Sequence, residues 1–205
     1  YTVTLNTDAT ITDFTLDSPH AIFRTPGGFQ RQFNVTGESR LLSGLVECRD
    51  GLWKGGTLLN DTDFDVYGLC YFGDFSSDGL DAVNNGRMNI RFVPGSGPQQ
   101  LILDGATTFT HASPADELVI DGQLRVQRGA AFTMTPAAKG IIVQPLGFLR
   151  VGGENPDATL TMNGGTLSVR NCTPLTEGGV RINNPGAFVL NDGLIDIKGF
   201  GDDLL

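Results

Sequence analysis

The chain has 205 residues, of which 28 are glycine and 10 are proline, so a residue that interrupts regular helices occurs about every five positions. Long helices are therefore excluded as the main element, and no apolar run is long enough to cross a membrane as a helix. Acidic residues outnumber basic ones by 23 to 14, which gives a formal net charge of -9. Because such a surface repels phosphate backbones, we expect no nucleic-acid partner.

The N-terminal half predicts strands separated by two loops. Apolar residues alternate with polar ones over Val3–Ile11, and Arg87–Val93 shows the same alternation. Residues 18–32 and 73–86 are rich in turn-forming residues and are predicted to be loops inserted between the strands.

The C-terminal half repeats one unit, in which alternating apolar residues are followed by a polar corner with glycine. The units begin at positions 101, 118, 141, 160 and 180, so their spacing is loose but recurrent. A period of roughly 20 residues favours stacked coils over a sandwich of two sheets. We therefore predict an all-β parallel β-helix (solenoid) of roughly ten coils, with loop insertions in the N-terminal half. Residues 1–205 are expected to form a single domain, in a chain processed or cut from a longer one.

Two segments carry a resemblance to known proteins. Leu160–Val169 and Tyr1–Thr10 resemble repeats of right-handed parallel β-helices, as found in autotransporter passengers, other secreted bacterial surface proteins and the pectin-lyase-like fold. The resemblance implies an extracellular or cell-surface location. It does not imply catalysis, because the two matches to polygalacturonase motifs, Asn6-Thr7-Asp8 and Asp202-Asp203, lie at opposite ends of the chain. Neither histidine lies between glycines.

Aspartates are dense between Trp53 and Asp81. Asp61, Asp63 and Asp65 alternate along one predicted strand, which spaces their carboxylates about 6.8 Å apart. Such hard oxygen ligands could hold calcium, the only cofactor that the sequence suggests. The alternative is a solvated acidic face, and the pattern of an EF-hand loop is absent.

Aromatic residues accompany these aspartates. Trp53, Tyr67 and Tyr71 are candidates for binding a carbohydrate or a protein partner, since sugar rings stack on aromatic faces and interfaces use the same residues. The alternative is that loops of the same region partly bury them.

Cys48 and Cys70 are separated in the sequence by close to one predicted coil. Stacked at the same position of neighbouring coils, their Cα atoms would lie about 4.8 Å apart, within the range of a disulfide. Two free buried thiols are the alternative. Cys172 leaves an odd count, so at least one cysteine is unpaired within the chain.

Glycosylation sequons begin at Asn34, Asn60 and Asn171, and chance alone accounts for about this many. Pro174 makes the last of them the weakest candidate, which leaves Asn34 and Asn60 as the predicted sites.

The leading functional hypothesis is a non-catalytic, secreted structural or adhesive solenoid that assembles into a cell-surface filament or layer. Tyr1–Thr4 and Gly193–Ile197 are strand-like and no capping helix covers them, so end-to-end or lateral contacts between copies are expected. The alternative is a protein that binds or degrades a polysaccharide through the aspartate and aromatic region.

Overall fold

The structure is a computed structural model that describes residues 1–28, 30–74, 79–95, 99–154, 156–170 and 179–198. These residues form strands and turns and no helix, so nothing in the described chain is a helix able to span a membrane. The strands of the described residues pair in parallel. The predicted all-β fold with parallel strands is therefore confirmed.

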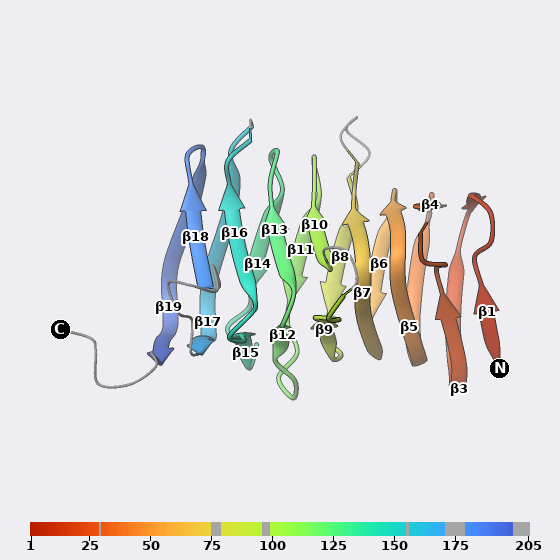
Figure 1. Ribbon diagram of the computed structural model, residues 1–205, viewed down its shortest axis with the longest axis horizontal. Helices are drawn as coiled ribbons and strands as arrows, with labels where there is room; N and C mark the ends of the chain where they lie inside the picture. Colours follow the sequence, from red (N-terminus) through yellow and green to blue (C-terminus); the bar gives the residue numbers. More distant parts are fainter. Residues whose placement is uncertain (29, 75–78, 96–98, 155, 171–178, 199–205) are drawn as a thin grey trace.

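Nineteen strands belong to one hydrogen-bonded sheet in the described chain. They are β1 (Thr2–Thr4), β2 (Ala9–Ile11), β3 (Phe14–Arg24), β4 (Arg31–Val35), β5 (Glu38–Lys54), β6 (Thr57–Asn60), β7 (Asp63–Phe72), β8 (Asp81–Asn84), β9 (Met88–Ile90), β10 (Gln100–Leu103), β11 (Thr108–His111), β12 (Leu118–Ile120), β13 (Gln123–Val126), β14 (Ala131–Met134), β15 (Gly140–Val143), β16 (Phe148–Gly152), β17 (Ala158–Arg170), β18 (Gly179–Asn183) and β19 (Gly186–Lys198). Figure 1 shows them as an elongated row, with β1 at one end and β19 at the other.

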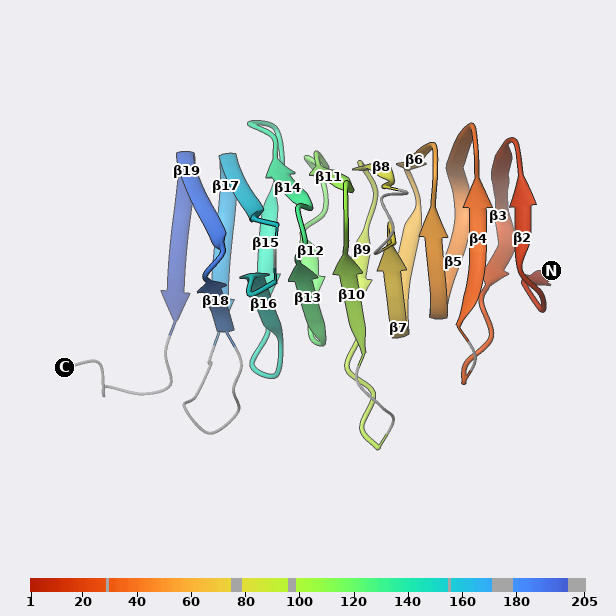
Figure 2. The same ribbon diagram turned by 90° about the horizontal axis from the view of Figure 1, so that it is seen from above.

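The pairings fall into three ladders of parallel strands. Ladder A joins β2, β4, the end of β5, the end of β7, β10, β13, β16 and β18. Ladder B joins the starts of β3 and β5 with β6, β8, β11, β14 and the starts of β17 and β19. Ladder C joins β1, the end of β3, the middle of β5, the start of β7, β9, β12, β15 and the ends of β17 and β19. The chain visits C, A and B in that order throughout, and Figure 2 shows the later strands of ladder A side by side.

The predicted repeat period is too short. Leu101 pairs with Leu124 and Leu118 pairs with Ile141, so register partners in the middle of the chain lie farther apart in the sequence than that period. The predicted starts of the repeats are not equivalent positions. Leu101 lies on ladder A, Leu118 on ladder C and Leu160 on ladder B. Among the described strands, ladders A and B each have eight members instead of the predicted ten or so.

The predicted loop insertions are also too long. Strand β3 continues to Arg24, β4 begins at Arg31, and Asp81–Asn84 forms β8 inside the second predicted loop. Pro19 and its polar neighbours indicated a loop, but they lie where the pairing of β3 with β5 shifts register between Asp17 and Ile22. A proline is tolerated at such an irregularity because no ladder hydrogen bond is needed there.

The structure also overturns the resemblance to right-handed parallel β-helices of the autotransporter and pectin-lyase-like types. The two segments behind it are not equivalent units: Tyr1–Thr10 spans ladders C and A, whereas Leu160–Val169 spans ladders B and C. Alternation and glycine corners are what any stack of parallel strands needs, so they do not identify a family.

Side chains at alternate positions of all three ladders meet in one core. In the N-terminal and middle strands this core contains consecutive aromatic rings, with centroids 4.9 to 6.2 Å apart. The rings belong to Phe23, Phe33, Trp53, Phe64, Phe72, Phe109 and Phe132. Aliphatic side chains continue the core toward β17, so neighbouring strands bury one another along the row.

Candidate functional site

Trp53 lies in the core and does not face solvent. Its side chain is 1% exposed and packs against Phe33 and Phe64, with ring centroids 4.9 and 5.7 Å away. The predicted carbohydrate contact at Trp53 is therefore wrong, because a buried ring offers no face to a sugar. Its indole N–H is buried without a hydrogen-bond acceptor among the described residues.

Tyr67 joins a cluster of polar side chains around Asp65. Asp65 is 4% exposed, and its carboxylate accepts hydrogen bonds from the Asn89 amide at 2.7 Å and from the Tyr67 hydroxyl at 3.1 Å. The Arg91 guanidinium donates to both carboxylate oxygens, at 3.1 and 3.2 Å. Since Phe64 and Val66 fill the core side of the strand, this cluster occupies its opposite side.

The electrostatics of this cluster favour a structural role. Burial, and then the Asp65 carboxylate, raise the pKa of Tyr67, so its proton is harder to remove than usual. Burial opposes the charge of Arg91, yet the hydrogen bond and charge of Asp65 raise the pKa of Arg91 above its ordinary value. Burial also raises the pKa of Asp121, and the charge of Arg91 partly offsets this. The Tyr67 hydroxyl and the Arg91 guanidinium thus both keep their protons and donate them to Asp65 in hydrogen bonds.

Tyr71 lies elsewhere, beside a hollow of about 290 Å³ on ladder A that is lined by Gln30, Leu52, Tyr71, Gly73, Asp74, Asp104 and Arg128. The charged groups of this hollow are paired. Lys54 contacts Asp74 at 2.9 Å, and Arg128 contacts both Asp104 and, at 3.0 Å, Glu154. Trp53, Tyr67 and Tyr71 therefore do not converge on one binding site.

The three aspartates of the predicted calcium site have separate partners. Asp61 accepts a hydrogen bond from Asn85 at 2.8 Å, and Asp63 forms an ion pair with Arg87 at 2.7 Å. Asp65 lies in the cluster described above. Asn85 and Arg87 both lie between β8 and β9. The described residues contain no group of three His, Cys, Asp or Glu side chains arranged to hold a metal.

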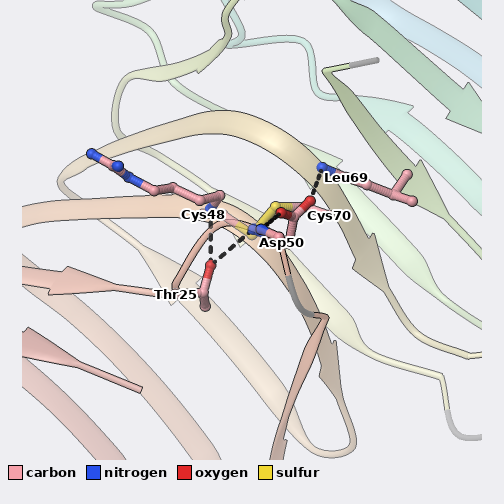
Figure 3. Close-up of a disulfide and its surroundings, with 7 residues drawn as sticks. Thr25, Cys48, Asp50, Leu69 and Cys70 are labelled. Atoms are coloured by element: carbon pink, nitrogen blue, oxygen red, sulfur yellow. Dashed lines mark hydrogen bonds between the residues drawn. A yellow bond between two sulfur atoms is a disulfide. The ribbon is translucent and has the colours of Figure 1, made fainter. Parts of the chain in front are cut away.

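Cys48 and Cys70 form a disulfide with a Cα–Cα distance of 6.3 Å (Figure 3). They are not stacked at the same position, as the spacing argument assumed, because Cys48 pairs with Val66 and Cys70 pairs with Gly51. The bridge therefore joins ladder C of one repeat to ladder A of the next. Cys172 lies outside the described residues.

Hydrogen bonds fix the backbone beside this disulfide. The Thr25 hydroxyl oxygen accepts from the backbone N–H groups of Arg49 and Asp50, at 2.8 and 3.3 Å. Asp50 in turn accepts from the backbone N–H of Leu69 at 2.9 Å, as Figure 3 shows. A Cβ at Gly68 would overlap the carbonyl oxygen of Arg49, so this corner requires glycine.

The sequons differ in accessibility. Asn60 is 1% exposed and its amide donates to Asn84, so a glycan there would have to displace core side chains. Asn34 lies half-buried in β4, and Asn171 lies outside the described residues.

The sequence analysis did not predict a buried row of polar side chains formed by Asn60, Asn84 and His111. The Asn60 amide donates to the Asn84 carbonyl oxygen at 2.6 Å, and Asn84 Nδ2 lies 3.0 Å from His111 Nδ1. His111 Nε2 lies 3.1 Å from the Gly140 carbonyl, which can only accept, so Nε2 carries the proton and Nδ1 accepts from Asn84. Burial lowers the pKa of His111, and its hydrogen bonds to Gly140 and Asn84 partly offset this. The histidine is thus held neutral.

A row of arginines was also missed. Arg125, Arg150 and Arg181 are register partners on consecutive strands of ladder A. The signal is present in the sequence as an aliphatic–Arg–aliphatic triplet at 124–126, 149–151 and 180–182. When the sequence is aligned with the predicted period of roughly 20 residues, these triplets do not fall at equivalent positions. In the structure they are neighbours, because β13, β16 and β18 pair in ladder A.

No protein-family model, curated protein sequence or solved structure matches this chain. The resemblance to right-handed parallel β-helix surface proteins therefore finds no support in any comparison, in agreement with the non-equivalence of its two segments.

Proposed function

We propose that the chain is a solenoid whose three ladders are the three sides of one stacked coil, and that it serves as a non-catalytic structural unit. Two observations support this proposal. The ladders recur in the fixed order C, A, B, and each strand pairs with the equivalent strand of the next repeat. The carboxylates and phenol that could have been catalytic are bound to one another and to basic side chains.

The observation that carries the proposal is the exposed apolar surface of the last described repeat. Ile182, Val189, Leu190, Leu194, Ile195 and Ile197 are 39 to 66% exposed. Four of them are register partners of core residues: Ile182 of Val151, Leu190 of Met162, Ile195 of Leu167 and Ile197 of Val169. Side chains of core type are thus left exposed beside the last described strands, and apolar patches of this kind mark interaction surfaces.

The backbone of β18 and β19 forms ladder hydrogen bonds on one side, to β16 and β17. In a parallel ladder the N–H and C=O groups of successive residues point alternately to the two neighbouring strands. Strands β18 and β19 pair with β16 and β17, and no described strand pairs with their far side. An unpaired parallel edge is a template for further strands.

The first described strands present a surface that matches the last ones. Strands β1, β2 and the start of β3 present ladders C, A and B, with Val3, Ile11 and Leu16 at core positions. We infer that a second copy supplies the strands that cover β18 and β19, so that copies join head to tail. The disulfide is consistent with an extracellular location, where such a filament would form part of a cell-surface layer without a cofactor.

Sedimentation analysis of the 205-residue chain over a hundredfold concentration range tests this proposal. The wild type is expected to grow in mass with concentration, whereas the L190D/I197D variant stays monomeric because it places charges on the end face. Leu146→Asp is the matched control, since Leu146 is 49% exposed but lies away from the end. A wild type that stays monomeric, or an equal effect of Leu146→Asp, would overturn the proposal.

A further inference from the structure

The outer side of ladder A carries three arginines in a row. Arg125 lies on β13, Arg150 on β16 and Arg181 on β18, and each is the register partner of the next. Their neighbours in the triplets, Leu124 and Leu149 among them, point into the core, so the arginines point outward. Adjacent strands are about 4.8 Å apart, so the row runs across the strands with one cation about every 5 Å. This set is the arginine stripe.

No carboxylate among the described residues pairs with the arginine stripe. None of its three members forms an ion pair with a described residue. The contrast is with six other arginines, which all contact a carboxylate: Arg24, Arg40, Arg49, Arg87, Arg91 and Arg128. In a chain of net charge -9, three like charges on neighbouring strands are therefore an isolated basic feature.

The stripe is partly desolvated and ordered. Arg125 donates to Gln123 at 3.1 Å, and the Arg181 guanidinium lies 5.4 Å from the centroid of the Phe148 ring. The Nε atoms of Arg125 and Arg150 are buried without a hydrogen-bond partner in the described chain. Arg125 and Arg150 are half-buried and Arg181 is exposed. Because the contacts of Arg125 and Arg181 restrict their side chains before an anion binds, binding loses less conformational entropy.

We propose that the arginine stripe binds a linear anionic glycan, whose carboxylate or sulfate groups follow the row across strands β13, β16 and β18. Guanidinium groups bind such oxyanions in a bidentate manner. The amide of Gln123 and the ring of Phe148 flank the row and offer a hydrogen-bonding group and an apolar face to the sugars. Nucleic acid is disfavoured, because the acidic remainder of the chain repels a continuous phosphate backbone.

This inference does not depend on head-to-tail assembly. Arg181 belongs to β18, the last described strand of ladder A, but the side chains of the stripe point outward from the side of the row of strands and not along it. Binding is expected to be weak and salt-dependent, since only three cations contribute. Each arginine removed should lower the affinity about tenfold, as is typical for hydrogen bonds to charged groups.

Binding is measured by isothermal titration calorimetry at low and at physiological salt concentration. The probes are a polyuronate, a heavily sulfated glycan, the methyl-esterified form of the same polyuronate and a single-stranded DNA of similar length. The wild type should bind the polyuronate or the sulfated glycan, whichever carries the matching anion. It should bind the esterified polymer and the DNA at least tenfold more weakly, because the ester lacks the anion and the DNA is repelled by the acidic surface.

The R125Q/R150Q/R181Q variant should lose at least a hundredfold in affinity, whereas R40Q/R49Q/R87Q changes net charge equally and should bind within twofold of the wild type. The single variant Arg181→Gln, at an exposed position, keeps the test valid if the triple variant unfolds, and it should lose about tenfold. If both triple variants lost the same affinity for the glycan, the effect would come from net charge, and the proposed binding site would be wrong. No binding of either anionic glycan, or equal binding of the DNA, would overturn the ligand class.

Discussion

The last two described strands of ladder C, the ends of β17 and β19, follow the same alternating pattern but differ in burial. Leu167 and Ile195 are register partners in ladder C, yet Leu167 is 2% exposed and Ile195 is 39% exposed. Leu167 has β15 on one side and β19 on the other, whereas Ile195 has only β17 beside it in the described chain. The comparison shows that alternation decides which side a residue faces, while burial comes from having a neighbouring strand on both sides.

The largest expected effect follows directly from this pair. Leu167→Ala should lower the free energy of unfolding by about 2–5 kcal/mol, as for other buried leucines, because it leaves a cavity between two strands. Ile195→Ala should cost less than about 1 kcal/mol in the monomer, because its side chain is already partly hydrated. Urea unfolding at low protein concentration measures both, and equal costs would contradict the two-sided account of burial.

The disulfide tests whether a cross-link between β5 and β7 adds to the stability that strand pairing and packing provide. The Cys48→Ser/Cys70→Ser variant should lose about 3 kcal/mol, because the unfolded chain regains the freedom of the loop that the bridge closes. The same loss should appear in the wild type under a reducing agent that leaves the double variant unaffected. A wild type that is equally stable with and without reductant would show that the bridge contributes nothing.

His111 gives stability a dependence on pH. Its pKa is lowered in the folded chain, so below about pH 6.5 the unfolded state binds the proton more readily than the folded state. Stability is therefore fully present above about pH 6.5 and falls as the pH drops toward the folded pKa, by at most about 1.4 kcal/mol per pH unit. His111→Asn should flatten this part of the stability curve, whereas the exposed control His20→Asn should leave it unchanged. Identical slopes in wild type and His111→Asn would contradict the neutral, buried assignment.

The smallest effect is expected at the exposed ion pair of Asp63 and Arg87, whose side chains are 43 and 46% exposed. Arg87→Gln should change the free energy of unfolding by less than about 1 kcal/mol, since exposed pairs are screened by solvent. Thermal unfolding in low and high salt measures this. A larger loss would show that partners on adjacent strands stabilise the stack more than exposure suggests.

From the sequence, the side of a strand to which a side chain points was predicted better than the strands that lie beside it. Alternation at Leu118 and Ile120 correctly indicated inward positions, since it follows from strand geometry alone. The period was wrong because corners between ladders differ in length, so equal spacing along the chain does not mean equal position in the stack. Trp53 was misplaced for a related reason: an aromatic residue beside aspartates suggests a binding face, but its inward phase on β5 decides its burial.

The arginine stripe and the Asn60–Asn84–His111 row depend on register even more strongly. The sequence interval from Arg125 to Arg150 is shorter than the interval from Arg150 to Arg181, so no constant period aligns the three. Their proximity follows only once the pairing of β13, β16 and β18 is known. The recurring triplet can be read along the chain, but it does not show that its three copies lie on neighbouring strands.

Amide hydrogen exchange at two protein concentrations tests the central claim most directly. At low concentration, the amides of β12 and β15 should be protected, while those of β19 that face away from β17 should exchange rapidly. At high concentration, the β19 amides should become protected, as a second copy supplies the missing strands, and the middle strands should not change. Rapid exchange of the same β19 amides at both concentrations would contradict the account.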